Sequence, residues 1–232
     1  MAIRLPENLA PENYPMGWLV DSWHGGGVLE YEGVDAAAYL HELTIDASDG
    51  GPYLKITSNV WLANEPAGIV DKEAPGQVTY DQLTKAELWS THTGFVRVNP
   101  ESEQRPDGSS ELEAMLVTPA GLAHAWVGLI NGPRFQLVID GVMRSASGAQ
   151  VDGARILGGS VGSELFYAID MEAFGSDMRS YMAGRMSRQF DDAVDPVVND
   201  AVSDDAGAGP AAGQTAAGQP GADQPAADQV SP

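Results

Sequence analysis

Apolar and polar residues alternate along several short stretches of the chain. The clearest stretch covers residues 53–62, where one face is apolar: Leu54, Ile56, Val60 and Leu62. A period of two is typical of a strand that is buried on one side. Similar short stretches predict further strands over residues 23–31, 86–98, 112–118, 122–130, 134–142, 150–158 and 164–171.

Turn-forming residues separate these stretches, as in Pro119-Ala120-Gly121 and Asn131-Gly132. Many short strands spaced about 10–12 residues apart favour an antiparallel sandwich or barrel. The strands do not alternate with long helical stretches, which argues against a parallel sheet. The pattern therefore predicts an all-β domain.

Helical patterns are few. Single helical turns are predicted over residues 12–20 and 81–87. Residues 178–186 fit either a helix or a strand, because methionines recur there at every fourth position and two of them also share a strand face with a glycine. Periodicity by itself leaves both structures open for this stretch.

The two ends of the chain differ from its middle. Residues 1–13 contain two prolines and predict an irregular lead-in. Residues 191–232 consist largely of Ala, Gly, Pro, Gln and Asp, with a glutamine every five residues from Gln214 to Gln229. Such a segment buries too little apolar surface to offset its ordering entropy, so we expect a disordered tail. Residues 14–190 remain as one compact domain.

Charge and composition narrow the function. The chain has 12 basic and 33 acidic residues, a net charge of −21, and no cysteine. Eight of the acidic residues are aspartates of the tail. Residues 1–190 therefore contain 25 acidic and 12 basic residues, and the domain itself is acidic. This balance argues against nucleic acid and against anionic membrane surfaces as partners. The absence of cysteine excludes thiolate chemistry and Cys-based metal sites. The sequence begins without a secretory leader and has no apolar run long enough to span a bilayer, so we expect a cytoplasmic protein.

No catalytic centre is visible from residue chemistry. The four histidines, at positions 24, 41, 92 and 124, lack metal-ligand spacing and are more typical of hydrogen-bonded wall or surface residues. The three glycines at 25–27 lack the Lys-Ser/Thr of a phosphate-binding loop and favour a bend or a close approach of backbones. A closed barrel of eight or more strands, by contrast, is able to enclose one small apolar ligand.

A compact motif covers residues 17–31. It contains Trp18-Leu19, then Trp23-His24-Gly25-Gly26-Gly27, and ends at Tyr31. It resembles the start of the nitrobindin family, whose signature is a short Trp-Leu helix followed by Gly-x-Trp-x-Gly-x-Gly and a strand that ends in tyrosine. The family's first glycine is Asp21 here, while Trp23, Gly25 and Gly27 match. Later segments resemble the family in the same order, so that the resemblance covers residues 14–190: 93–97, 118–121, 166–171 and 178–188.

The resemblance implies an antiparallel ten-stranded barrel, similar to fatty-acid-binding proteins and lipocalins, in which residues 178–188 form the closing strand. Members of the family bind ferric haem b through one axial histidine and isomerise peroxynitrite to nitrate. The family's closing pattern places Tyr181 at the axial position and Ala149 where a haem-contacting lysine stands. Both substitutions disfavour haem. A phenol ionises near pKa ~10 and needs a cationic neighbour to become a ligand at neutral pH. Alanine at position 149 removes a cation that would support the negatively charged edge of the haem.

Three interpretations follow. The first is a nitrobindin-like barrel without haem or any other cofactor and without enzyme activity, open to a small hydrophobic ligand. The second is a haem-dependent peroxynitrite isomerase with Tyr181 or a displaced histidine as axial ligand, His24 and His92 being the candidates. The third is a scaffold whose acidic tail binds a partner of unknown kind.

Overall fold

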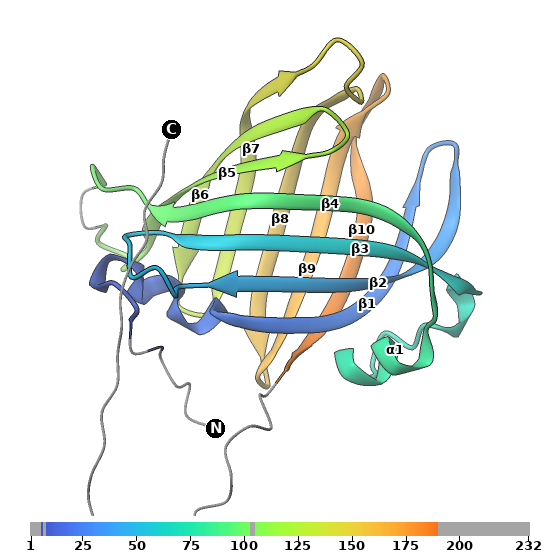
Figure 1. Ribbon diagram of the computed structural model, residues 1–232, viewed down its shortest axis with the longest axis horizontal. Helices are drawn as coiled ribbons and strands as arrows, with labels where there is room; N and C mark the ends of the chain where they lie inside the picture. The colour runs from blue at the N-terminus through green and yellow to red at the C-terminus, as the bar shows by residue number, and fades with distance from the viewer. Residues whose placement is uncertain (1–5, 7, 103–104, 190–232) are drawn as a thin grey trace, which may run out of the picture. The chain divides into compact units, whose positions relative to one another are not determined.

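The computed structural model describes residues 6, 8–102 and 105–189. Ten antiparallel strands form a closed barrel in which each strand pairs with its neighbours in sequence, and the last strand pairs with the first (Figure 1). The predicted ten-stranded barrel is thereby confirmed. The predicted tail, residues 191–232, lies outside the described residues, as do residues 1–5 and 7 of the predicted lead-in.

The elements follow one another along the chain in a simple order. A 3₁₀ helix, η1, precedes the first strand, and a second short 3₁₀ turn, η2, and the helix α1 lie between the third and fourth strands. Their bounds are η1 Pro11–Leu19, β1 Asp21–Tyr31, β2 Val34–Asp46, β3 Leu54–Pro66, η2 Ala67–Ile69, α1 Gly76–Gln82, β4 Lys85–Val98, β5 Ser110–Thr118, β6 Leu122–Asn131, β7 Arg134–Arg144, β8 Val151–Val161, β9 Glu164–Ala173 and β10 Ser176–Arg188.

Residues 178–188, which periodicity left open, belong to strand β10. Seven of its residues pair with β1 and eight pair with β9. Its register with β9 shifts between Ser180 and Met182, so that Tyr181 is the extra residue of a β-bulge. Bulges of this kind bend a strand and redirect one side chain. The two short hairpin turns at Gly33 and Gly132 have positive φ, the conformation that tight two-residue turns require.

Strand β2 was missed in the pattern of alternation for a physical reason. Its inward positions are apolar or aromatic, such as Tyr39, and its outward positions Ala38 and Leu40 are buried as well. Those outward residues pack with Leu83, which follows α1, in a second small apolar cluster. A strand that is covered on both faces reads as a continuous apolar run and loses its period of two.

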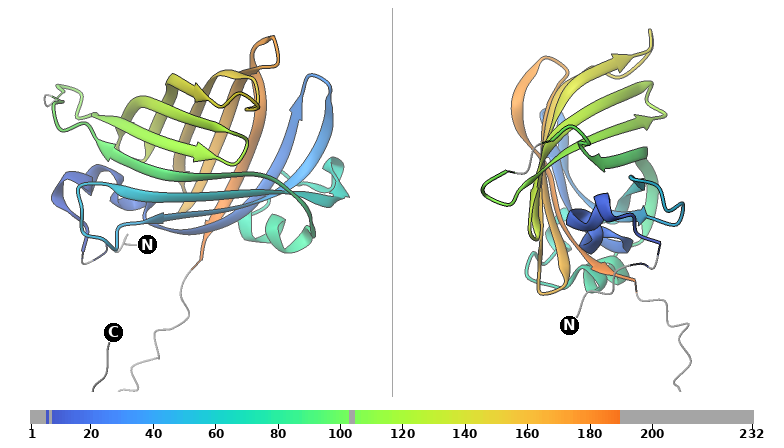
Figure 2. Two further views of the ribbon diagram at one scale, coloured as in Figure 1. Left: turned by 45° about the horizontal axis from the view of Figure 1, so that its top comes forward. Right: turned by 90° about the vertical axis from the view of Figure 1, so that its left-hand side faces the viewer.

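The predicted helical turn over residues 12–20 is confirmed by η1, but the one over residues 81–87 is wrong. The helix α1 ends at Gln82, and residue 85 already pairs with β3 at the start of β4. Helix η1 lies at one end of the barrel and α1 near the other (Figure 2). None of the helices in the described part of the chain has the length and hydropathy that a transmembrane helix needs.

Candidate functional site

The two ends of the barrel interior differ in burial. At the end next to η1, here called the floor, the inward-facing side chains are fully buried: Trp23, Ile45, Leu54, Val96, Leu112, Ile130, Leu137, Leu165 and Met186. At the opposite end, here called the mouth, several inward-facing apolar side chains keep part of their exposure to solvent: Leu62, Leu116, Ile139, Ile156 and Ile169. Leu29 and Leu122, which lie toward the same end, are buried, so the mouth is partly open and the floor is packed.

A tyrosine–histidine chain, made of Tyr39, Tyr167, His41 and Ser58, crosses the interior between floor and mouth. The Tyr39 and Tyr167 hydroxyls are 2.8 Å apart, and the Tyr167 hydroxyl lies 2.7 Å from His41 Nδ1. His41 Nε2 lies 2.8 Å from Ser58 Oγ. All three contacts are satisfied when Tyr39 donates to Tyr167, Tyr167 donates to Nδ1, and the Nε2–H donates to Ser58. The chain leaves no ring nitrogen of His41 without a partner.

The interior histidines are neutral. Burial lowers the pKa of His41 to about 3, with a further lowering by nearby His92. Burial also lowers the pKa of His92 to about 4, with a further lowering by His124. Each histidine thus disfavours the charge of the next, because two imidazolium ions in a desolvated space repel each other. At neutral pH the interior carries imidazoles that act both as donors and as acceptors.

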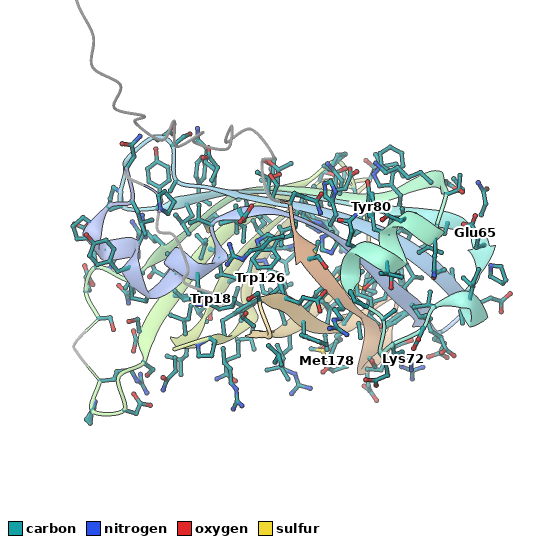
Figure 3. All side chains as sticks on the ribbon, turned by 90° about the horizontal axis from the view of Figure 1, so that it is seen from below. Trp18, Glu65, Lys72, Tyr80, Trp126 and Met178 are labelled. Atoms are coloured by element: carbon teal, nitrogen blue, oxygen red, sulfur yellow. The ribbon has the colours of Figure 1, made fainter. Side chains whose placement is uncertain are left out.

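A second polar group, the His124–Trp126 pair, lies on the inner face of β6. His124 is 4% exposed and Trp126 is 5% exposed, and their rings meet edge to face with centroids 6.1 Å apart. Neither nitrogen of His124 has a hydrogen-bond partner within the described residues, and the same is true of the Trp126 indole N–H. Figure 3 labels Trp126 inside the barrel. Buried polar groups are normally paired, so three unpartnered nitrogens on two neighbouring residues are unusual.

Tyr181 lies at the mouth end of β10. Its hydroxyl accepts a hydrogen bond from the indole N–H of Trp89 on β4. Its ring packs edge to face against Tyr31, with centroids 5.9 Å apart. Burial raises the pKa of the Tyr181 phenol, and the Trp89 hydrogen bond only partly offsets this rise. Tyr181 is therefore a protonated phenol whose oxygen is already engaged.

A separate groove of about 870 Å³ lies on the outside of the barrel, over β8, β9, β10 and β1. Two arginines of its lining form ion pairs, Arg179 with Glu32 at 2.9 Å and Arg185 with Glu164. None of the buried unpartnered polar atoms found within the described residues belongs to the lining of this groove. Within the described residues, three of the six buried side-chain nitrogen and oxygen atoms without a hydrogen-bond partner belong to His124 and Trp126, and the other three belong to Asn13, Trp18 and Trp61.

Comparison with known proteins identifies the family. Residues 12–188 match the model of the THAP4-like, heme-binding β-barrel domain. The chain belongs to this family, the nitrobindins. A ferric nitrobindin-like protein of Beutenbergia cavernae is 32% identical over 215 residues, covering 81% of this chain and 99% of that protein. A peroxynitrite isomerase of Frankia casuarinae is 38% identical over 178 residues, covering 76% of this chain and 85% of that protein.

A solved structure shows the same fold. The crystal structure of Rv2717c from M. tuberculosis superposes with a TM-score of 0.60 over 78% of this chain and 99% of that chain. The two sequences share 22% identity, so this likeness concerns the fold alone.

The residues of the nitrobindin-like motif lie at the seam between β1 and β10. A Cβ at Gly25 or Gly27 would overlap with a carbonyl oxygen of β10, so glycine allows the two strands to close the barrel. The Asp21 carboxylate forms an ion pair with Arg188 at 2.8 Å across the same seam. The Trp23 indole is buried and donates to the Leu19 carbonyl at 2.9 Å. These positions serve barrel closure, while the buried indole N–H of Trp18, at the start of the motif, has no hydrogen-bond partner among the described residues.

The remaining candidates are divided between the inside and the outside. His92 faces the interior, and its side chain has no hydrogen bond within the part of the chain that the structure describes. His24 faces outward and stacks on Tyr80 of α1, with ring centroids 4.7 Å apart. Ala149 lies in the loop between β7 and β8, where its N–H donates to the Ala120 carbonyl at 3.1 Å. The sequence gave no signal for Trp89, because its partner Tyr181 is 92 residues away.

Proposed function

We propose that this protein is a nitrobindin-fold barrel that binds a small hydrophobic molecule and does not hold ferric haem through residue 181. The proposal takes Tyr181 to stand at the position of the family's axial histidine, as the resemblance of residues 178–188 to the closing strand implies. The observation that carries the proposal is the hydrogen bond from Trp89 to the Tyr181 hydroxyl. It engages the oxygen that would have to bind the iron, and it fills the space between β4 and β10 with an indole ring.

The ionisation of Tyr181 supports the same conclusion. Ferric haem is held by a neutral imidazole or by a tyrosinate. Burial raises the pKa of the Tyr181 phenol, and no cationic side chain contributes to lowering it. The two arginines nearest in sequence are engaged elsewhere, since Arg179 pairs with Glu32 and Arg185 pairs with Glu164. The residues around position 181 do not fit haem, and on this proposal the protein is not a peroxynitrite isomerase.

A second candidate function rests on His92. This histidine faces the interior, is neutral at pH 7 and has no hydrogen-bond partner among the described side chains, which is the state that an iron ligand requires. The family is a heme-binding one, and the Frankia casuarinae relative is named as a peroxynitrite isomerase. On this alternative His92 replaces the axial histidine, haem b is the cofactor, and the activity is retained.

An absorption titration of hemin separates the two candidates. We expect no saturable Soret shift for the wild-type chain or for the matched control Tyr181→Phe, which removes the hydroxyl without adding a nitrogen ligand. We expect a shift for Tyr181→His, and a stronger one for Tyr181→His combined with Trp89→Leu, which removes the indole from the space next to residue 181. A tight shift in the wild-type chain that is lost in His92→Leu contradicts the proposal and supports the second candidate.

A further inference from the structure

The His124–Trp126 pair has three buried nitrogens without a hydrogen-bond partner among the described residues, whereas the other such atoms, on Asn13, Trp18 and Trp61, occur one to a residue. Burying a polar group without a hydrogen bond destabilises a protein by about 1–3 kcal/mol. The same interior shows that pairing is feasible, because His41 has partners on both ring nitrogens. His124 and Trp126 thus keep free hydrogen-bonding capacity at a cost in stability, which is the expected signature of groups that bind a ligand.

The donors and acceptors of the pair define the chemical class of that ligand. The Trp126 indole is a donor only, whereas a neutral imidazole offers one donor and one acceptor. A group that meets both residues must accept a hydrogen bond from the indole N–H, and it pairs with His124 either by donating to the unprotonated ring nitrogen or by accepting from the ring N–H. A carboxylic acid meets both residues through two different atoms, since its carbonyl oxygen accepts from the indole N–H and its O–H donates to a ring nitrogen of His124.

Other head groups match the pair less well. An ammonium group has only donors and leaves the Trp126 N–H unpaired. A permanent anion such as a sulfate needs a buried counter-charge, and burial is the sole cause of the lowered pKa of His124, without a contribution from any charged side chain. A head group that is neutral when it is bound, or that brings one proton with it, avoids this cost.

The surroundings of the pair suit an apolar tail. His124 is flanked in register by Leu116 on β5 and by Val142 on β7, neither of which titrates. The titratable group that faces it from β4 is His92, and the tyrosine–histidine chain lies beyond. Toward the mouth the inward side chains are aliphatic and partly exposed: Leu62, Ile139, Ile156 and Ile169.

We propose that the barrel interior binds a monocarboxylic acid with an apolar tail, whose carboxyl group lies between His124 and Trp126. This inference rests on the proposed function and specifies its ligand. At neutral pH a free carboxylate is ionised, so binding takes up one proton from solvent. The proton resides on the carboxyl group or on His124, and in either case one proton is bound per ligand.

Isothermal titration calorimetry of decanoic acid into the full chain tests the inference. Measurement in buffers of different ionisation enthalpy counts the protons, and we expect one proton per decanoate. One bound proton makes the affinity fall about 100-fold between pH 5.5 and pH 7.5, since the decanoate carboxyl is ionised over most of this range. Decan-1-ol, which lacks the acid, and decyl sulfate, which stays anionic, serve as matched ligands and should bind at least about tenfold more weakly at pH 5.5, a difference of one hydrogen bond.

Variants locate the head group. His124→Leu keeps the approximate volume of the side chain and should lower the decanoate affinity at least about tenfold, as expected for the loss of one hydrogen bond to a buried acid. Trp126→Phe removes the N–H and should weaken binding in the same direction. His24→Gln changes a histidine on the outer face and should leave the isotherm unchanged. Thermal unfolding of each variant verifies that the barrel is intact.

Several results would overturn the inference: binding of none of the three decyl probes, equal binding of decanoate and decan-1-ol, no proton uptake, or full affinity in His124→Leu. If decan-1-ol still binds in such a case, the proposed function of binding a hydrophobic molecule is retained. The proposed function itself is contradicted by a different result, the formation of a hemin complex by the wild-type chain in the absorption titration.

Discussion

The tyrosine–histidine chain and the His124–Trp126 pair are two polar groups in the same interior with opposite states of satisfaction. In the chain, two tyrosines and a serine engage both nitrogens of His41. In the pair, the nitrogens of His124 and Trp126 are buried and unpartnered among the described residues. Both histidines are buried, so solvent exposure does not explain the difference. The chain is suited to fixing strands to one another, and the pair is suited to receiving a molecule.

The two groups also differ in how many strands they connect. The chain joins the neighbouring strands β2 and β3 to β9, which is distant from them in sequence, through contacts that span up to 128 residues. It therefore ties together the two sides of the β1–β10 seam, next to Gly184, where any Cβ would overlap with the Tyr39 hydroxyl. His124 and Trp126 belong to one strand and tie nothing together. Their removal should leave the strand arrangement unchanged.

The largest effect is expected for Tyr167→Phe, which breaks the middle of the chain. The substitution leaves the Tyr39 hydroxyl and His41 Nδ1 buried without a hydrogen-bond partner. Two unpaired buried groups should lower the free energy of unfolding by roughly 3–4 kcal/mol. Urea denaturation measures this loss. Tyr39→Phe is the control, because it removes only the terminal hydroxyl and should lower the free energy of unfolding by about 1–2 kcal/mol. Equal effects of the two variants would contradict a directional chain.

Acid should weaken the fold through the interior histidines. Their folded pKa values, about 3 for His41 and about 4 for His92, lie below the unfolded value near 6.5. Below pH 6.5 the unfolded chain binds protons that the folded chain excludes, so stability is full above this pH and is lost as pH falls toward the folded values. Between pH 7 and 5.5 the two residues should lower the free energy of unfolding by roughly 2–3 kcal/mol.

Urea denaturation of the wild-type chain and of His92→Gln at these pH values checks the acid effect. The variant should lose about 1 kcal/mol of the pH dependence, the share of one histidine, because His92 no longer titrates while His41 and the other histidines with lowered pKa, His24 and His124, still do. The carboxylates with lowered pKa, Glu42 and Glu164, titrate at lower pH and do not interfere in this range. A flat profile between pH 7 and 5.5 would show that the histidines do not remain buried and neutral.

The smallest expected effect has the opposite sign. In the absence of ligand, His124→Leu replaces an unpartnered buried imidazole by an apolar side chain of similar size, and it should raise the free energy of unfolding by about 1 kcal/mol. Thermal unfolding of the variant and of wild type measures the gain. A loss of stability would mean that His124 is paired after all and that the comparison between the two groups does not stand.

Much of the barrel was predictable from local pattern. The alternation over residues 53–62 marks β3, and the turns at Gly121 and Gly132 separate β5, β6 and β7. The pattern failed for β2, because Ala38 and Leu40 are covered from outside and lose their polar alternation. The resemblance to the nitrobindins supplied the strand number and the place of residues 178–188, which periodicity left open.

The candidate site was only partly predictable. Alternation along β6 places His124 and Trp126 on one face, but not whether that face points inward. The choice between His24 and His92 as an interior histidine also depended on the fold, which places His24 outside against Tyr80. The sequence singled out Tyr181 and Ala149 as departures from the family, and their consequence for haem remains the proposal made above.

The sequence by itself determined most of the strands, their turns and the family, because side-chain periodicity and turn chemistry are local properties of the chain. Tertiary structure alone decided which polar groups meet. Barrel closure brings Trp89 to Tyr181 and Tyr39 to Tyr167 across long stretches of sequence, while the side-chain nitrogens of His124 and Trp126 meet no partner in the part of the chain that the structure describes. Hydrogen bonds form between groups that the fold makes neighbours. The closed barrel therefore determines which buried polar groups have a hydrogen-bond partner, and with this it separates the structural residues from the proposed ligand-binding ones.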